Sequence, residues 1–193
     1  MKTGFQTVLG MLMGVTAIAL TTPAYAQDQF NNAAISFDVD TVVEFEFVES
    51  RGVYQSTFGV INLNTGDRIP LIREVRSSDR ASTGFSTLAD DTGTPGNSVS
   101  QALAEFEFEA NTPYAFYLES FYNGQPAGVF YSIDARNLNN SRRLRFEGDA
   151  SNLGAGGVVM RWDDTGSLLV PPQDQDRDYN DFTVRAGGHL ACP

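Results

Sequence analysis

The sequence has almost no residues that could build a covalent or zinc-linked framework. It contains one cysteine, Cys192, and one histidine, His189, both close to the C-terminus. A single cysteine excludes an intrachain disulfide, and a single histidine leaves a zinc site or a Ser-His-Asp triad without the other groups it needs. Cys192 can pair with another chain, stay free or be modified, and its terminal place favours an incidental thiol. Stability must therefore come from a packed core and from any bound metal.

Positive charge is also scarce, with 13 lysines and arginines against 24 aspartates and glutamates and a formal net charge of −11. Nucleic acid and anionic membrane surfaces are poor partners for such a chain, because both attract basic proteins. The one basic cluster, Arg142-Arg143-Leu144-Arg145, suits an acidic polysaccharide or internal charge balance with Glu147 and Asp149. Surface charge pairs are common, which favours the second interpretation.

Long apolar runs are absent outside residues 1–26. Lys2, the apolar segment Val8–Leu20 and the small-x-small sequence Ala24-Tyr25-Ala26 have the order of a cleavable export signal, which leaves Gln27 as the first mature residue. The apolar segment is too short to span a bilayer comfortably. We therefore expect an exported protein that is secreted, periplasmic or held at the cell surface, with a single domain over residues 27–193.

Apolar and acidic residues alternate along much of the remaining chain. Phe37–Glu49 has aromatic and β-branched residues at odd positions and mostly acidic residues at even ones, and Glu105–Glu109 repeats the design. This period predicts strands with one face in a core and an acidic face in water. Further strands are expected at Val53–Leu63, Tyr114–Phe121, Val129–Ile133, Leu144–Phe146, Val158–Trp162, Ser167–Val170 and Asp181–Arg185. Short polar connections between them predict an all-β fold, an antiparallel β-sandwich or jelly roll.

Two segments depart from this alternation. Residues 77–101 are polar and rich in glycine, and we expect a long loop across one end of the sandwich that is either functional or disordered. Overlapping its end, Ser98–Ala104 carries the one helical pattern outside the signal. The second segment, residues 173–181, is a strongly acidic turn.

That acidic turn is the most informative segment for function. Its carboxylates repel one another, and a hard cation with about six to eight oxygen ligands would relieve the repulsion. Export favours calcium further, because extracellular calcium can fill a site of modest affinity. The candidate ligands are Asp174, Asp176, Asp178 and Asp181, with Asn180, Asp163 and Asp164 as weaker candidates.

The turn does not follow the EF-hand pattern. Tyr179 stands at the sixth position, where that loop needs glycine, and Arg185 at the twelfth, where it needs glutamate. The alternative interpretation is a solvated acidic hairpin in which aspartate and asparagine serve turn geometry. In either case we expect Tyr179 and Phe182 to pack inward and anchor the turn.

The sequence Asp176–Phe182, together with Trp162-Asp163-Asp164, resembles a family of exported bacterial domains of unknown function, often cyanobacterial. In that family an aromatic-Glu-Asp element precedes a Gly-rich Asp-x-Asp-[Tyr/Phe]-Asn-Asp turn near the end of the domain. The resemblance implies a calcium-associated β domain, and it does not by itself imply a catalytic activity. This chain departs from the family pattern at Asp163, where glutamate is usual, and at Pro171-Pro172-Gln173, which replaces the Gly-rich lead.

The sequence therefore predicts a non-catalytic surface or extracellular interaction module with a structural Ca²⁺ site, whose partner is an unidentified polysaccharide or surface protein. One alternative is a carbohydrate-binding module, because several aromatic residues fall between residues 114 and 131. A more distant one is a jelly-roll glycoside hydrolase that uses two of Glu44, Glu46 and Glu105, although their alternation favours a solvated strand face. The aromatic residues are Tyr114, Tyr117, Phe121, Tyr122 and Tyr131.

Overall fold

The computed structural model describes residues 30–51, 53–77, 98–148, 157–164 and 177–187. Two short 3₁₀ helices, η1 (Asp134–Arg136) and η2 (Leu138–Asn140), interrupt a chain of strands. The described residues contain no helix with the length and apolarity that a membrane crossing requires. The strands are β1 (Thr41–Ser50), β2 (Gln55–Asn62), β3 (Arg68–Arg73), β4 (Leu103–Phe108), β5 (Tyr114–Tyr122), β6 (Gln125–Tyr131), β7 (Leu144–Gly148), β8 (Val158–Trp162) and β9 (Phe182–Ala186).

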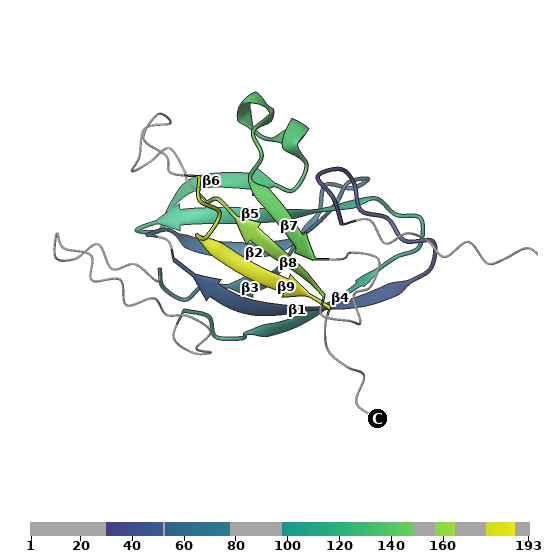
Figure 1. Cartoon of the computed structure of the whole chain (residues 1–193), viewed down its shortest axis with the longest axis horizontal. Coiled ribbons are helices and arrows are strands. Elements are labelled where there is room, and N and C mark those ends of the chain that lie inside the picture. Colours follow the sequence, from purple (N-terminus) through teal and green to yellow (C-terminus); the bar gives the residue numbers. More distant parts are fainter. Residues whose placement is uncertain (1–29, 52, 78–97, 149–156, 165–176, 188–193) are drawn as a thin grey trace, which may run out of the picture.

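These strands form two antiparallel sheets. One has the order β4-β1-β9-β8-β7 and the other the order β3-β2-β5-β6. The sheets stack face to face, with the five-stranded sheet in front in Figure 1. The predicted all-β antiparallel sandwich is therefore confirmed.

Aromatic side chains fill the space between the sheets. The ring of Phe58 in β2 lies 5.6 Å from that of Phe45 in β1 and 5.6 Å from that of Phe116 in β5, measured between centroids. Trp162 in β8 meets Phe58 edge-on at 6.4 Å. All four side chains are fully buried, and burial of each stabilises the fold by roughly 1.5–3 kcal/mol. The apolar residues at the inward-facing positions of the strands thus form one continuous core between the sheets.

Two local predictions need correction. Ser98–Ala104 is not helical, since Val99 forms a β-bridge with Glu74 and β4 begins at Leu103. β3 was not expected, because Pro70 and the flanking arginines obscure its pattern; proline is tolerated there since β3 is an edge strand that needs ladder bonds on one side only. The expected strand at Ser167–Val170 lies outside the described residues.

The expected turn between β5 and β6 is a tight hairpin. Asn123 and Gly124 both have positive φ angles, 49° and 74°, which a two-residue type I′ connection requires. Asparagine and glycine tolerate this left-handed conformation better than other residues do. The Asn-Gly pair therefore fixes the register that brings Phe121 opposite Pro126.

Candidate functional site at the polar end of the sandwich

Buried polar side chains gather where β8 ends and where β2 and β9 begin. Ser56, Ser120, Glu74 and Asp163 have no exposed surface, and Asp164 is 2 % exposed. Buried charges require partners, so each of these groups is expected to be engaged. We call this region the polar end and define it as Ser56, Glu74, Ser120, Arg143, Asp163, Asp164 and Asp181.

Ser56 joins the two sheets at the polar end. Its hydroxyl donates a hydrogen bond of 2.9 Å to Oδ2 of Asp164, which follows β8 in the other sheet. Its backbone N–H donates to Oε2 of Glu74 at 2.6 Å, and its Oγ lies 3.2 Å from that of Ser120. A hydrogen bond to a charged group contributes about 1.5–3 kcal/mol to stability, so we expect the bond from Ser56 to Asp164 to stabilise the contact between the sheets measurably.

Asp163 forms an ion pair with Arg143. Nη1 of Arg143 lies 3.1 Å from both carboxylate oxygens of Asp163, and the Arg143 guanidinium also lies over the ring of Phe130. The Asp163 carboxylate is therefore already engaged by a cation. Arg142 pairs with Asp134 at 3.2 Å, so two arginines of the basic cluster form internal ion pairs. Glu147, an expected partner, pairs with Arg161 instead, and Asp149 lies outside the described residues.

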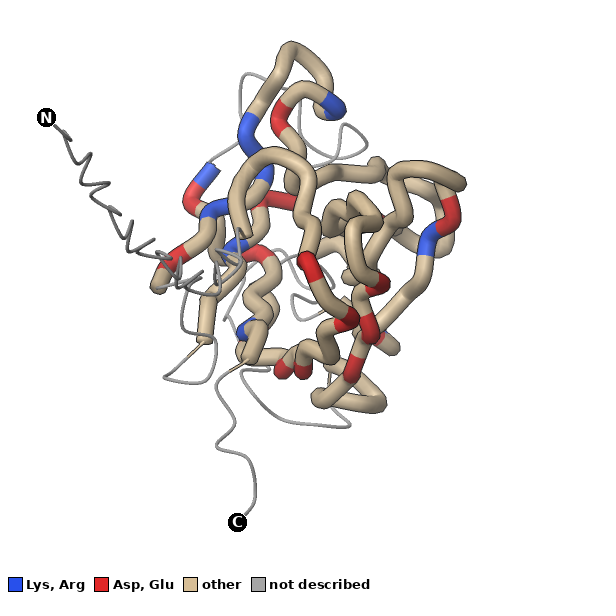
Figure 2. The backbone as a smooth tube through the Cα atoms, turned by 90° about the vertical axis from the view of Figure 1, so that its right-hand side faces the viewer, with Lys and Arg blue, Asp and Glu red and all other residues tan. Residues whose placement is uncertain are grey.

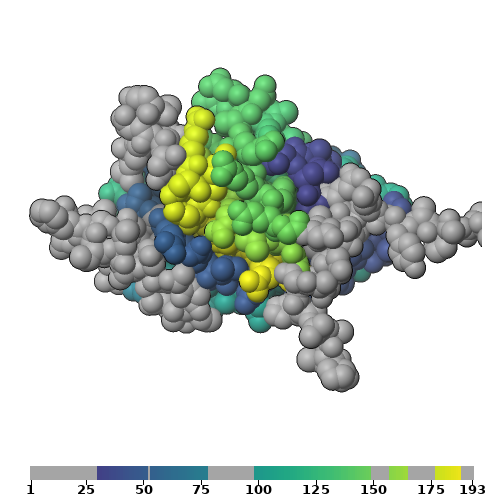
Figure 3. All heavy atoms as spheres, in the orientation of Figure 1, coloured from purple at the N-terminus to yellow at the C-terminus, as the bar shows by residue number. Residues whose placement is uncertain are grey.

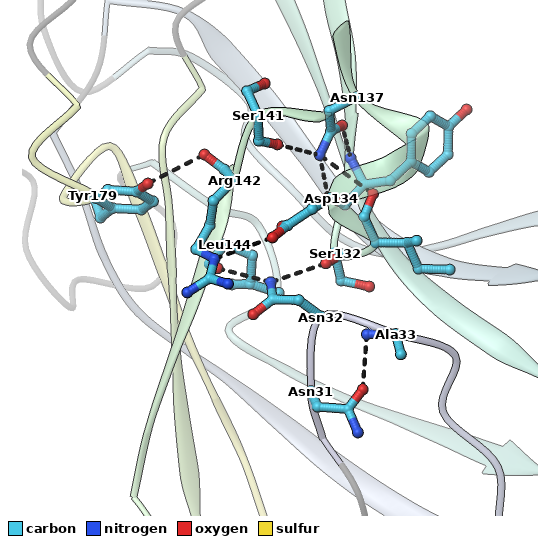
Figure 4. Close-up of polar contacts among 12 residues, drawn as sticks. Asn31, Asn32, Ala33, Ser132, Asp134, Asn137, Ser141, Arg142, Leu144 and Tyr179 are labelled. Carbon is cyan, nitrogen blue, oxygen red and sulfur yellow. Dashed lines mark hydrogen bonds and ion pairs between the residues drawn. The ribbon is translucent and has the colours of Figure 1, made fainter. Parts of the chain in front are cut away.

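The described part of the acidic turn is anchored by Tyr179, as expected. This side chain is 6 % exposed, and its hydroxyl donates to the carbonyl of Arg142 at 3.1 Å (Figure 4). The guanidinium of Arg145 lies 3.8 Å from the centroid of the Tyr179 ring. Phe182 is fully buried in the main core. The predicted inward packing of both aromatic residues is confirmed.

The two acidic segments of the sequence meet at the polar end. Oδ2 of Asp181 accepts a hydrogen bond of 2.9 Å from the backbone N–H of Asp164. Asp178 instead accepts hydrogen bonds from the backbone and side-chain nitrogens of Asn180. Asp174 and Asp176 lie outside the described residues. Among the residues that the structure describes, no three acidic, histidine or cysteine side chains form a group that could hold a metal ion.

Sequence reasoning missed Ser56 and Glu74. Glu74 follows β3, the strand that was not expected, and its contact with Ser56 spans 18 positions in the sequence. Ser56 carried a usable signal, because it shares the inward parity of Phe58 and Val60 and so had to be a polar side chain in the core.

The aromatic residues of the carbohydrate-binding alternative do not form one open platform. Tyr114 packs into the main core, whereas Tyr117 and Tyr131 lie on the outer face of the four-stranded sheet. Arginine side chains lie over both outer rings, Arg68 at 5.7 Å from Tyr117 and Arg136 at 5.8 Å from Tyr131. Burial, with a smaller contribution from the Glu119 carboxylate, raises the pKa of Tyr117 to about 12.

The glutamates of the hydrolase alternative lie on the outer face of the five-stranded sheet. Glu44 stands opposite Glu105 in the β1–β4 ladder, and Glu105 is exposed to water. Glu46 forms an ion pair with Arg185 at 3.2 Å. Among the described residues these glutamates thus lie on a strand face, whereas hydrolysis of a glycoside would need a carboxyl pair in a site that excludes water.

Fold and site together define a class: an all-β antiparallel sandwich whose two sheets are tied at one end by buried charges and hydroxyls. No protein-family model, curated protein or solved structure matches this chain. The family resemblance of the acidic turn therefore stays a hypothesis, and function has to be inferred from the polar end itself.

Proposed function

We propose that this protein is an exported, non-catalytic β-sandwich module that binds a structural Ca²⁺ at the polar end and acts in interactions at a surface or outside the cell. The observation that carries the proposal is the hydrogen bond of 2.9 Å from the Asp164 N–H to the Asp181 carboxylate. It joins the Trp162-Asp163-Asp164 element to the acidic turn, as a shared ion site requires.

The contacts narrow the expected ligand set. Asp163 is engaged by Arg143, and Asp178 by Asn180, whereas Asp164 and Asp181 are the two candidates that a direct hydrogen bond brings together, and we propose them as the ligands. A carboxylate has about four acceptor positions, so Asp164 can accept from Ser56 and still bind a cation. Asp174 and Asp176 of the same acidic turn would complete an oxygen-rich site of the kind that Ca²⁺ prefers.

A bound ion at this place would act on the fold rather than on a substrate. Asp164 is hydrogen-bonded to Ser56 of the four-stranded sheet, and Asp181 directly precedes β9 of the five-stranded sheet. An ion held by both aspartates would therefore fasten the two sheets together and remove the repulsion between their carboxylates. This is the physical reason to assign calcium a structural role.

Fluorescence of Trp162 tests the proposal directly. Trp162 is the single tryptophan of the chain and directly precedes Asp163 and Asp164. Calcium added to the EDTA-treated protein should change its emission in a saturable way. Asp164→Asn and Asp181→Asn should weaken this response. Each variant keeps the size of the side chain and one acceptor oxygen but removes the negative charge that binds the cation.

Asp67→Asn is the matched control, since Asp67 is an exposed aspartate in the β2–β3 turn. Its titration should superimpose on that of the parent protein. A parent protein that shows no response to millimolar calcium, or a response that both site variants retain in full, would overturn the calcium assignment.

A further inference from the structure

The loop between β6 and β7 is fixed by internal hydrogen bonds and exposes one leucine side chain to solvent. Leu138 is 81 % exposed, the largest exposed fraction among the large apolar side chains of the described residues. In Figure 3 the green atoms of this segment rise above the body of the molecule. Solvent exposure of a single leucine is ordinary, so the informative feature is how the loop around it is fixed.

The side chain of Asn137 fixes the loop from within. It accepts a hydrogen bond of 2.8 Å from the N–H of Tyr131 and donates bonds of 2.8 Å and 3.0 Å to the carbonyls of Tyr131 and Ser141 (Figure 4). Asn139 and Asn140, next to Leu138, both have left-handed φ angles, 56° and 52°. Asn137 is 8 % exposed, so these bonds are shielded from water.

Further contacts fix the base of the loop. Nδ2 of Asn32 donates to the carbonyls of Ser132 and Leu144, each at 3.0 Å, and so bridges the two strands between which the loop rises. The Tyr179 hydroxyl bonds to the Arg142 carbonyl on the other side. The backbone around Leu138 is thus already ordered before binding, which reduces the conformational entropy that would be lost when a partner binds.

Two exposed arginines, Arg136 and Arg142, flank Leu138 in the sequence. Arg142 pairs with Asp134, the one acidic residue between β6 and β7, and the guanidinium of Arg136 lies over the ring of Tyr131. We define Leu138, Arg136 and Arg142 as the loop tip. It is an apolar and cationic surface on a chain whose net charge is −11.

The opposite side of the molecule carries a complementary surface. Val42 in β1 is 62 % exposed and Leu103 in β4 is 52 % exposed, and both lie on the outer face of the five-stranded sheet. Glu105 and Glu107 project from the same face of β4, and no arginine of the described residues pairs with either. We define Val42, Leu103, Glu105 and Glu107 as the acidic strip.

The two surfaces cannot serve one another within a single molecule. β4 is one edge strand of the five-stranded sheet, and β7, which follows the loop tip, is the other. Figure 1 shows the loop at the top and β1 with β4 along the bottom. In Figure 2 most basic positions lie in the upper half of the view, whereas acidic positions occur in both halves and several lie close together at the bottom.

We propose that the loop tip of one copy docks on the acidic strip of a second copy, so that the chain associates head to tail. Leu138 would contact Leu103, and Arg136 would face Glu105. Opposite potentials attract and orient the two surfaces, and apolar contact holds them. Because the two surfaces differ, a head-to-tail dimer leaves one loop tip and one acidic strip unused, and association can continue beyond a dimer. The contact does not depend on the proposed calcium site.

Sedimentation equilibrium of the purified protein over a range of concentrations tests this contact. At low ionic strength the average mass of the parent should rise with concentration, and 0.5 M NaCl should weaken the association roughly tenfold or more by screening. A tip variant, Leu138→Ser with Arg136→Glu, should remain monomeric. A strip variant, Leu103→Ser with Glu105→Lys, should also remain monomeric. All four side chains are exposed, and thermal midpoints within about 2 °C of the parent would show that each variant is folded.

The decisive sample is the equimolar mixture of the two variants. Each variant keeps the surface that the other has lost, so the mixture should form dimers and no larger species. Val75→Ser with Asp67→Lys changes exposed residues elsewhere and should associate as the parent does. A monomeric parent at all concentrations, a mixture that stays monomeric although the parent associates, or loss of association in the control variant would overturn the proposal.

Discussion

The middle of the sandwich and its polar end hold the same two sheets together in different ways. In the middle, Phe45, Phe58 and Phe116 join the sheets by apolar contact. At the polar end, Ser56 and Asp164 join them by a hydrogen bond of 2.9 Å. Apolar contact is non-directional and insensitive to ions, whereas buried charges act only with their partners in place. Bound ions should therefore act on this fold through its polar end.

Truncation of the core should have the largest effect. Phe58→Ala removes a fully buried ring that contacts both sheets, and we expect a loss of about 3–5 kcal/mol in the free energy of unfolding measured with urea. Phe58→Leu should cost clearly less. The loss should be the same with calcium and with EDTA, and a loss that depends on calcium would remove the distinction between the two regions.

Breaking the Arg143–Asp163 pair should be nearly as costly. Arg143→Met leaves the buried Asp163 carboxylate without this cation, and we expect a loss of about 3 kcal/mol, since the Arg143 side chain is 11 % exposed. The double variant Arg143→Met/Asp163→Leu should recover most of that loss in the same urea titration. A double variant as unstable as the single one would show that the charge is not the cause.

Loss of the Ser56 hydroxyl should have a moderate effect. Ser56→Ala removes the donor to Asp164 and keeps the backbone bond to Glu74, so we expect a loss of about 2 kcal/mol. Ser120→Ala spares the bond to Asp164 and should cost about 1 kcal/mol. Equal losses in the two variants would mean that the inter-sheet bond adds nothing to stability.

The effect that is smallest at neutral pH, where it vanishes, comes from the burial of Tyr117, and it is confined to alkaline pH. Burial raises the pKa of Tyr117 from 10.0 to about 12, so the folded state keeps a proton that the unfolded state loses between these values. The contribution of Tyr117 is thus complete below pH 10 and is lost as pH rises towards 12, at most about 3 kcal/mol. Tyr117→Phe should flatten this part of the stability curve. An unchanged curve would refute the assignment to Tyr117.

The strands could be predicted from sequence because the alternation of apolar and polar residues that marks a strand lies within a few consecutive positions. Alternation placed Val158–Trp162 in one strand with the same ends as β8, and it placed Phe45 and Phe47 in the core. β3 escaped this reasoning, since its proline is allowed only by its place at an edge, and that place is a property of the whole sheet.

The polar end could be predicted only in part. The sequence offered Asp163 and Asp164 as further ligands beside the acidic turn. The hydrogen bond between Asp164 and Asp181 shows that these two segments are in contact. It gave no indication that Ser56 would meet Asp164, 108 positions away, or that Arg143 would engage Asp163. Such partnerships depend on how two sheets stack, which periodicity within one strand does not encode.

Thermal unfolding with EDTA and with millimolar calcium tests the role of the polar end most directly. It should be measured for the parent, for Asp164→Asn/Asp181→Asn and for the control Asp67→Asn. Calcium at a hundred times its dissociation constant should stabilise the parent and the control by about 2.7 kcal/mol, a rise of several degrees in midpoint, and should leave the double variant unchanged. Equal midpoints of the parent in EDTA and in calcium would contradict an ion-dependent polar end.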